Sequence, residues 1–162
     1  VSEAEWRAVR LMREVRHPHL IAVHGAWEAH GYLVVAMEPA DGSLADRLRE
    51  CVGRGLPGVP RDELLGYMAG AADALDHLNG PRHPDGAGGV RGIQHRDVKP
   101  QNLLLVGGGV KVADFGLARA LTGGATGHTG SMTIDYAAPE FFAGRTSAHS
   151  DQYSLAVTYC HL

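Results

Sequence analysis

Lysine is scarce in this chain, and neither sign of charge is in large excess. Only Lys99 and Lys111 occur among 162 residues, and the formal net charge at pH 7 is −3. Nucleic-acid-binding domains carry clustered basic surfaces, so this balance predicts no nucleic-acid partner. The length is sufficient for one domain with a hydrophobic core.

Cysteine is nearly absent, and long apolar runs are missing. Cys51 and Cys160 lie far apart and match no metal-binding or disulfide spacing, which indicates reduced thiols. No apolar run reaches the ~20 residues needed to cross a bilayer, and no signal peptide opens the chain. These features predict a cytoplasmic chain with no membrane segment, although a parent protein can be anchored through a segment elsewhere.

Histidine, in contrast, is frequent, with ten residues. The closest pair, His17 and His19, flanks a proline and has no cysteine or carboxylate at zinc-ligand spacing. We therefore expect scattered surface and turn histidines and no zinc site.

Apolar periodicity predicts helices and hairpins in alternation. The clearest element is a helix over 62–78, where one apolar stripe recurs at helical spacing and acidic residues favour the N-terminus. The other predicted helices cover 3–16, 44–51 and 149–162, and the predicted strands cover 20–27, 32–37, 103–106 and 110–113. We expect a turn at 41–43, glycine-rich connectors at 53–60 and 79–92, and a mobile loop at 122–130.

The most informative stretch is residues 95–102, His-Arg-Asp-Val-Lys-Pro-Gln-Asn, followed twelve residues later by Asp114-Phe115-Gly116. It combines two carboxylates, an ammonium and an amide. Phosphoryl transfer from a magnesium-bound nucleotide requires this set. The acceptor hydroxyl needs a base or an orienting carboxylate, the migrating phosphoryl group needs a cation, and the metal needs oxygen ligands.

With Ala138-Pro139-Glu140, these motifs occur in the order typical of the eukaryotic-type protein kinases, and the chain resembles the serine/threonine group of that family. Its composition resembles that of bacterial members. The resemblance implies an α+β, two-lobe kinase fold in truncated form. Residues 1–38 would be a remnant of the small lobe, one helix plus a hairpin. Residues 39–162 would be the hinge and the first part of the large lobe.

The resemblance assigns the chemistry to four residues. Asp97 would accept or orient the proton of the substrate hydroxyl, and Lys99 would neutralise the γ-phosphate of ATP. Asn102 and Asp114 would hold Mg²⁺, with Mn²⁺ as an alternative, and all but Asp97 would contact the nucleotide. Without the resemblance, the aspartates would be interpreted as turn caps and Lys99 as a solvated surface lysine.

The resemblance also assigns an adenine pocket. Met37 would be the gatekeeper, and the backbones of Glu38 and Ala40 would pair with the adenine edge. Leu104 would pack under the ring, a role compatible with that of a plain core leucine.

Regulatory roles follow from the same resemblance. Arg96 marks kinases whose activation loop is ordered by a phosphate, for which Thr129 is the candidate site, with Thr126 and Ser131 as neighbours. Thr133 would contact the catalytic aspartate and lysine. A flexible polar loop is the alternative interpretation of this segment.

Three further residues are expected to be structural. Phe115 would act as a packing switch, and His95 would belong to the core stack that meets it. Asp151 would be a buried aspartate that accepts N–H groups from the catalytic loop. The arginine partner that the family provides for Glu140 is not expected in this chain.

The helix glutamate of the family would lie ten residues before Pro18, which is Ala8. Glu5, one turn earlier, is the preferred candidate for this regulatory position, with Glu3 and Glu14 as alternatives.

No lysine precedes Lys99, and no glycine-rich phosphate loop is visible, so we expect a fragment of a kinase domain. The main hypothesis is a serine/threonine protein kinase whose partners are protein substrates, with autophosphorylation or a kinase dimer as further options. The alternative is a non-catalytic, pseudokinase-like binding module or an inert fragment. A small-molecule kinase is disfavoured by Ala138-Pro139-Glu140 and Thr133.

Overall fold

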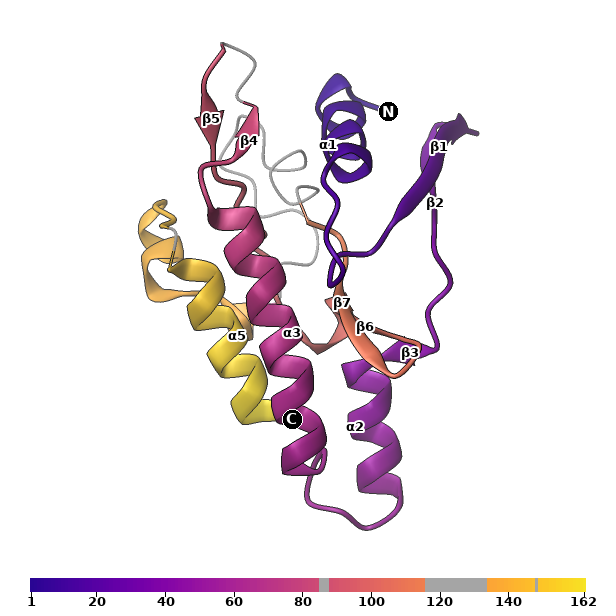
Figure 1. Cartoon of the computed structure of the whole chain (residues 1–162), viewed down its shortest axis with the longest axis vertical. Coiled ribbons are helices and arrows are strands. Elements are labelled where there is room, and N and C mark those ends of the chain that lie inside the picture. Colours follow the sequence, from indigo (N-terminus) through magenta and orange to yellow (C-terminus); the bar gives the residue numbers. More distant parts are fainter. Residues whose placement is uncertain (85–87, 116–133, 148) are drawn as a thin grey trace.

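The computed structural model describes residues 1–84, 88–115, 134–147 and 149–162. Helices and small antiparallel sheets form the α+β fold that the sequence predicts (Figure 1). The helices are α1 (Glu3–Glu14), α2 (Leu44–Gly53), α3 (Arg61–Asn79) and α5 (Ser150–His161), with short 3₁₀ turns η1 (Pro100–Asn102), η2 (Ile134–Tyr136) and η3 (Pro139–Ala143). The strands are β1 (Val23–Ala29), β2 (Tyr32–Met37), β3 (Gly42–Ser43), β4 (His83–Pro84), β5 (Val90–Arg91), β6 (Leu103–Val106) and β7 (Gly109–Val112).

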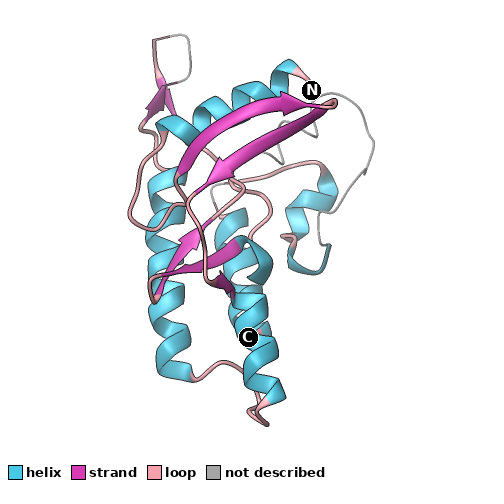
Figure 2. Cartoon of the chain, turned by 90° about the vertical axis from the view of Figure 1, so that its right-hand side faces the viewer, coloured by secondary structure: helices cyan, strands magenta, loops and turns pink. Residues whose placement is uncertain are grey.

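Helix α1 begins with a capping box. The Ser2 hydroxyl accepts from the Glu5 N–H, and the Glu5 carboxylate accepts from the Ser2 N–H at 2.6 Å. This reciprocal pair satisfies N–H groups that a helix start leaves unpaired. The helix buries Ala8, Val9 and Met12 and packs along the β1–β2 hairpin (Figure 2).

The first predicted strand, 20–27, is divided between two partners. Val23–Ala29 pairs with β2, but Leu20 makes an isolated parallel bridge to Val112 of β7. A register irregularity near Gly25 lies early in the paired stretch. The second strand has the predicted bounds.

A three-stranded sheet has the order β3-β6-β7. The β6–β7 hairpin turns at Gly107 and Gly108, whose φ angles of +58° and +81° suit glycine. Residues 42–43, predicted as part of a turn, instead pair with β6. Their extended backbone leads directly into the capping box of α2 at Ser43.

Helix α3 carries the main core. Its predicted apolar stripe is buried: Leu64, Met68, Ala71, Leu75 and Leu78. In Figure 1 it runs between α2 and α5, and it packs against α5 and β7. Within the described residues, no helix has both the length and the apolar composition that a membrane crossing requires.

The region 79–92 is not simply the loop that its glycine and proline content predicts. The short strands β4 and β5 pair within it, with His83 opposite Arg91. Ile93 N–H then donates to the Leu78 carbonyl at 2.7 Å, which returns the chain to the end of α3.

Candidate active site

The register of the β6–β7 hairpin places two of the predicted site residues at one end of the sheet. Leu103 pairs with Val112, so Asn102 and Ala113 are the next facing residues. Ala113 N–H donates to the Asn102 carbonyl at 2.9 Å. Asp114, one residue further, is thereby brought to the same end as the loop that carries Asp97.

Asp97 is held by two residues of its own loop. The Asn102 Nδ2 atom donates to the Asp97 carbonyl at 2.7 Å and to its Oδ2 atom at 3.0 Å. Lys99 Nζ lies 2.8 Å from the same Oδ2 atom. Three of the four predicted groups are therefore in contact, and the carboxamide oxygen of Asn102 is the atom of that side chain suited to a cation.

Asp114 lies half-buried near this group. Burial raises the pKa of its carboxyl, and the charge of Asp97 acts in the same direction, while His95 and Lys99 act in the opposite direction. Its φ of +62° is in the left-handed region, as is the +70° of Arg96. Such a backbone costs roughly 1–2 kcal/mol in a non-glycine residue, so surrounding contacts must hold both residues in place.

The donors fit a hard divalent cation. Carboxylate and amide oxygens are the ligands that Mg²⁺ and Mn²⁺ prefer. In the part of the chain that the structure describes, no group of three or more His, Cys, Asp or Glu side chains could hold an ion by itself. Mg²⁺ commonly binds one or two protein carboxylates together with phosphates and water, so Asn102 and Asp114 suit an ion delivered with a nucleotide.

Hydrogen bonds to a buried carboxylate support the catalytic loop. Asp151 accepts the N–H groups of His95 and Arg96, each at 2.8 Å, and the Asn79 Nδ2 atom at 3.2 Å. The prediction that Asp151 is a buried acceptor for catalytic-loop N–H groups is confirmed. Because Asp97 N–H donates to His95 Nδ1 at 3.2 Å, Nε2 carries the ring proton and donates to the Ala113 carbonyl at 2.8 Å. His95 is thus structural.

Phe115 is fully buried in the main core, which suits the packing role predicted for it. Gly116, Thr129 and Thr133 lie outside the described residues, as do Thr126, Ser131 and the loop predicted at 122–130.

The predicted hinge is fixed by the side chain of Glu38. Lys111 Nζ donates to its two oxygens at 2.7 and 2.9 Å, and Ala22 N–H donates to Oε1 at 2.7 Å. Burial opposes ionisation of this carboxyl, but these hydrogen bonds outweigh burial and lower its pKa. The Glu38 N–H donates to the Ala22 carbonyl. Sequence reasoning missed this role of Lys111, because it depends on backbone hydrogen bonds that join residues 19–22 to both Val112 and Glu38.

The other adenine-pocket candidates lie close to this hinge. Met37 ends β2 and is half-buried, whereas Ala40 is exposed. Leu104 is half-buried and directly opposite Lys111 in the β6–β7 ladder, so both side chains share one face of the sheet. A pocket of about 360 Å³ is lined by residues 15–18 and 20–22 together with Lys111, and none of the four catalytic candidates lines it.

Glu5 and Ala8 occupy different environments on α1. Hydrogen bonds from Ser2 lower the pKa of the Glu5 carboxyl, with the larger effect from the Ser2 N–H and a smaller one from its hydroxyl. Glu5 therefore already has a structural role in the capping box. Ala8, at the family's usual glutamate position, is buried. The regulatory assignment of Glu5 stays a prediction.

Glu140 is paired with hydroxyl groups in place of the arginine that the family provides. Ser150 Oγ donates to its Oε1 atom at 2.6 Å and Ser147 Oγ at 3.4 Å. The bond from Ser150 is the main reason that the pKa of this carboxyl is lowered.

The expectation of scattered histidines is wrong for four of them. The rings of His17 and His77 lie 4.7 Å apart between centroids, and His77 and His83 lie 5.5 Å apart. His19 lies 6.0 Å from His17. They come from the segment after α1, from α3 and from β4, and only the fold brings these segments together, so no sequence spacing could indicate the cluster.

The sequence of this chain is similar to those of known proteins. The family described as "Protein kinase domain" matches residues 2–162. "CBL-interacting protein kinase 4" of Oryza sativa subsp. japonica is 36% identical over 158 residues, which cover 93% of this chain and 32% of that protein. "Serine/threonine-protein kinase PknF" of Mycobacterium tuberculosis is 33% identical over 177 residues, 99% of this chain and 34% of that protein. The chain thus spans about a third of the length of these relatives. It belongs to the protein kinase domain family, in the eukaryotic-type serine/threonine group.

Proposed function

We propose that this chain carries the phosphoryl-transfer site of a serine/threonine protein kinase that uses ATP with Mg²⁺, or Mn²⁺ in its place. The observation that supports it most is the contact of Asp97 with both Lys99 and Asn102, beside Asp114. In this proposal residues 1–38 belong to the small lobe, residues 39–162 form the hinge and part of the large lobe, and the chain works in the cytoplasm.

Bound Mg²⁺–ATP supplies the transferable phosphoryl group. Asp97 orients the serine or threonine hydroxyl of a protein substrate and takes its proton as the new P–O bond forms and ADP leaves. Lys99 neutralises the transferring group, and the Asn102 oxygen and the Asp114 carboxylate would hold Mg²⁺.

The remaining assignments complete the proposal. The backbones of Glu38 and Ala40 pair with the adenine edge, Met37 is the gatekeeper, and Leu104 packs under the ring. Arg96, Phe115, Glu5, Thr129 and Thr133 have regulatory roles, and Thr129 is the site at which autophosphorylation, within one chain or in a kinase dimer, would act.

A non-catalytic binding module is the second candidate. Lys111 is held by Glu38, and Lys99 is the only other lysine in the chain, so this chain offers no further ammonium for the α- and β-phosphates. The catalytic alternative is favoured by the positions of Asp97, Lys99, Asn102 and Asp114.

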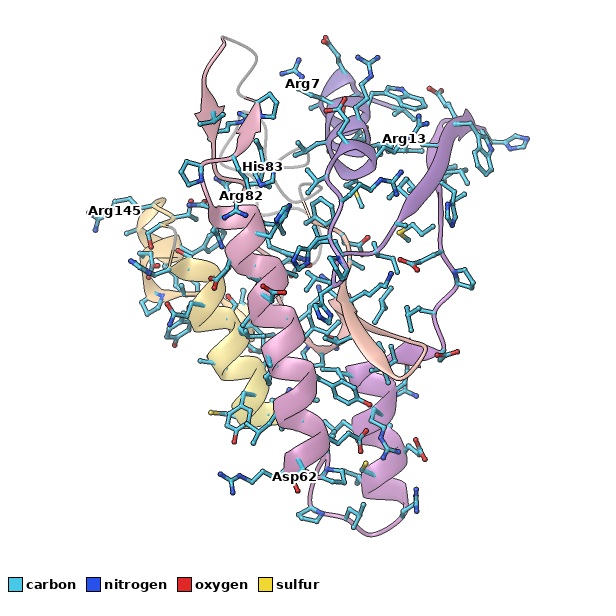
Figure 3. All side chains as sticks on the ribbon, in the orientation of Figure 1. Arg7, Arg13, Asp62, Arg82, His83 and Arg145 are labelled. Carbon is cyan, nitrogen blue, oxygen red and sulfur yellow. The ribbon has the colours of Figure 1, made fainter. Side chains whose placement is uncertain are left out.

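Transfer of labelled phosphate from ATP to a generic basic protein tests the proposal on the full-length protein. We expect Asp97→Asn and Asp114→Asn each to reduce labelling at least about a hundredfold, and chelation of divalent cations to abolish it. Asp62→Asn is the matched control, because Asp62 is exposed at the far end of α3 (Figure 3). Equal labelling by all four proteins would contradict the kinase function, and nucleotide binding without Asp97-dependent transfer would support the binding module.

A further inference from the structure

Gln94 lies between two stretches of fixed backbone. On one side, Ile93 N–H is bonded to the Leu78 carbonyl. On the other side, the N–H groups of His95 and Arg96 are bonded to Asp151. The half-buried Gln94 side chain is therefore presented from a rigid position immediately before the catalytic loop.

The Gln94 Oε1 atom accepts two hydrogen bonds. Arg96 Nε donates to it at 3.3 Å, and Thr146 Oγ1 donates at 2.6 Å. An arginine Nε–H can only donate, so the atom facing it must be the carbonyl oxygen of the amide. This requirement fixes the orientation of the amide, and both donors share one acceptor.

Thr146 belongs to the segment between η3 and α5. Its neighbours Arg145 and Ser147 are exposed, and Arg145 projects outward beside α5 in Figure 3. The Glu140–Ser150 hydrogen bond holds the two ends of this segment together. Through Thr146 and Gln94, the segment that follows Ala138-Pro139-Glu140 is connected to the residue that precedes Asp97.

Arg96 requires such support because of its backbone. Its φ of +70° is costly for a residue with a side chain, and such conformations persist only where surrounding contacts determine them. Asp151 holds its N–H, and Gln94 holds its guanidinium group. Asp97, the next residue, depends on the same backbone.

We propose that Gln94 is a positioning residue that fixes the Arg96 guanidinium and couples the segment containing Thr146 to the catalytic loop. This inference rests on the proposed function for its kinetic consequence, but its structural part is independent of activity. In catalysis, misplacement of a reacting group by about 1 Å can cost a hundredfold in rate, so a modest loosening at Arg96 is enough to matter.

The structural part is tested by solvent exchange of the Arg96 Nε–H, followed by NMR on the ¹⁵N-labelled chain. Arg96→Lys removes the resonance and so assigns it. We expect Gln94→Leu to speed exchange about fivefold, as for the loss of one ordinary hydrogen bond, and Thr146→Val to speed it less. Gln94→Glu keeps an acceptor oxygen and should retain slow exchange of the Arg96 Nε–H. The matched control is Gln152→Leu, because Gln152 is an exposed glutamine on α5. Unchanged exchange in Gln94→Leu would overturn the proposal.

The kinetic part uses the full-length kinase. We expect Gln94→Leu to lower kcat about tenfold with KM for ATP within about twofold, because Gln94 positions the loop and is not among the proposed nucleotide contacts. Thr146→Val should lower kcat less, and the double variant should equal Gln94→Leu. Unchanged kcat in Gln94→Leu, with Asp97→Asn inactive, would overturn the coupling. If wild type shows no Asp97-dependent transfer, the proposed function fails, and the exchange measurement alone decides the role of Gln94.

Discussion

At the scale of single residues, the catalytic loop depends on a carboxylate beneath it. Asp151 is only 1% exposed, and it accepts hydrogen bonds from two loop N–H groups and from Asn79. Buried carboxylates are stable only with partners of this kind. The loop conformation and the folding of α5 are therefore linked through one side chain.

Replacing Asp151 should destabilise the protein strongly. We expect Asp151→Ala to lower the free energy of unfolding by about 2–4 kcal/mol, because one buried and one partly buried N–H group lose their acceptor. Asp151→Asn keeps one oxygen and should cost less. Urea denaturation followed by circular dichroism measures both, with exposed Asp62→Ala as the control. If Asp151→Ala proves as stable as Asp62→Ala, the scaffold role assigned to Asp151 is wrong.

At the scale of elements, α2 and α3 are joined by an arginine fork. Arg47 donates to the two Glu63 oxygens at 2.7 and 2.9 Å, and Tyr67 donates to the same carboxylate at 3.0 Å. Both charged side chains are mostly shielded, with 20% and 26% exposed. A lysine has a single ammonium and cannot reproduce the paired bonds.

We expect Arg47→Lys to lower the free energy of unfolding by about 0.5–1.5 kcal/mol. Arg49→Lys on the same helix should be nearly neutral, because Arg49 is 77% exposed and surface ion pairs contribute little. Thermal or urea unfolding of the three proteins compares them. Equal losses in both variants would show that the fork contributes nothing specific.

The two-glycine turn of the β6–β7 hairpin is a second element-scale feature. A Cβ atom at Gly108 would meet no neighbour, so only its backbone angle opposes a side chain. Gly108→Ala should therefore cost roughly 1–2 kcal/mol, measured by urea unfolding. Gly53→Ala, also in open space but in a helix, should be neutral or slightly stabilising and serves as the control.

At the scale of the whole molecule, the histidine cluster joins segments that are distant in the sequence. His77 lies between His17 and His83, and Arg82 is also beside it. His17 in turn lies near His19 and 3.4 Å from Asp73. Figure 3 places Arg82 and His83 at the end of α3 opposite to Asp62. The pKa of His77 is lowered below 6.5, mainly by burial and then by the nearby His17, Arg82 and His83. Asp73 has a smaller opposing effect.

Stability should therefore fall on mild acidification. The pKa of His77 is lower in the folded chain than the 6.5 of the unfolded chain, so the unfolded chain binds more protons once the pH falls to about 6.5. The contribution of His77 to the free energy of unfolding is therefore present above pH 6.5 and is lost as the pH falls below it. Glu38 and Glu63 have lowered pKa values, so their contributions are lost only in a separate window below 4.5. The urea midpoint should therefore decrease as the pH falls through 6.5 and below it.

His77→Phe keeps an aromatic ring without a titrating group and should flatten this pH dependence. His149→Phe, at an exposed position, should retain it. An unchanged slope in His77→Phe would exclude the cluster as its source.

Much of this arrangement is predictable from local patterns, and the rest depends on tertiary contacts. The apolar stripe of α3 and the motif around Asp97 predict an element and a site because their residues are close in sequence. Asp151 was predicted through a family resemblance, since its partners are more than fifty residues away. Gln94, Lys111 and the histidine cluster carry no local pattern. The role of Gln94 depends on the return of the chain at Ile93 to the end of α3. The role of Lys111 depends on the backbone hydrogen bonds that join residues 19–22 to Val112 and Glu38. The histidine cluster forms where the segment after α1 meets α3 and β4.

The ladder between β6 and β7 also limits how the gene for this chain can change. Side chains alternate between faces along each strand, so loss of one codon within 103–106 or 109–112 would turn Leu104 or Lys111 to the opposite face and separate Asn102 from Asp114. Among functional descendants of this sequence, length differences should therefore be rare between 103 and 114.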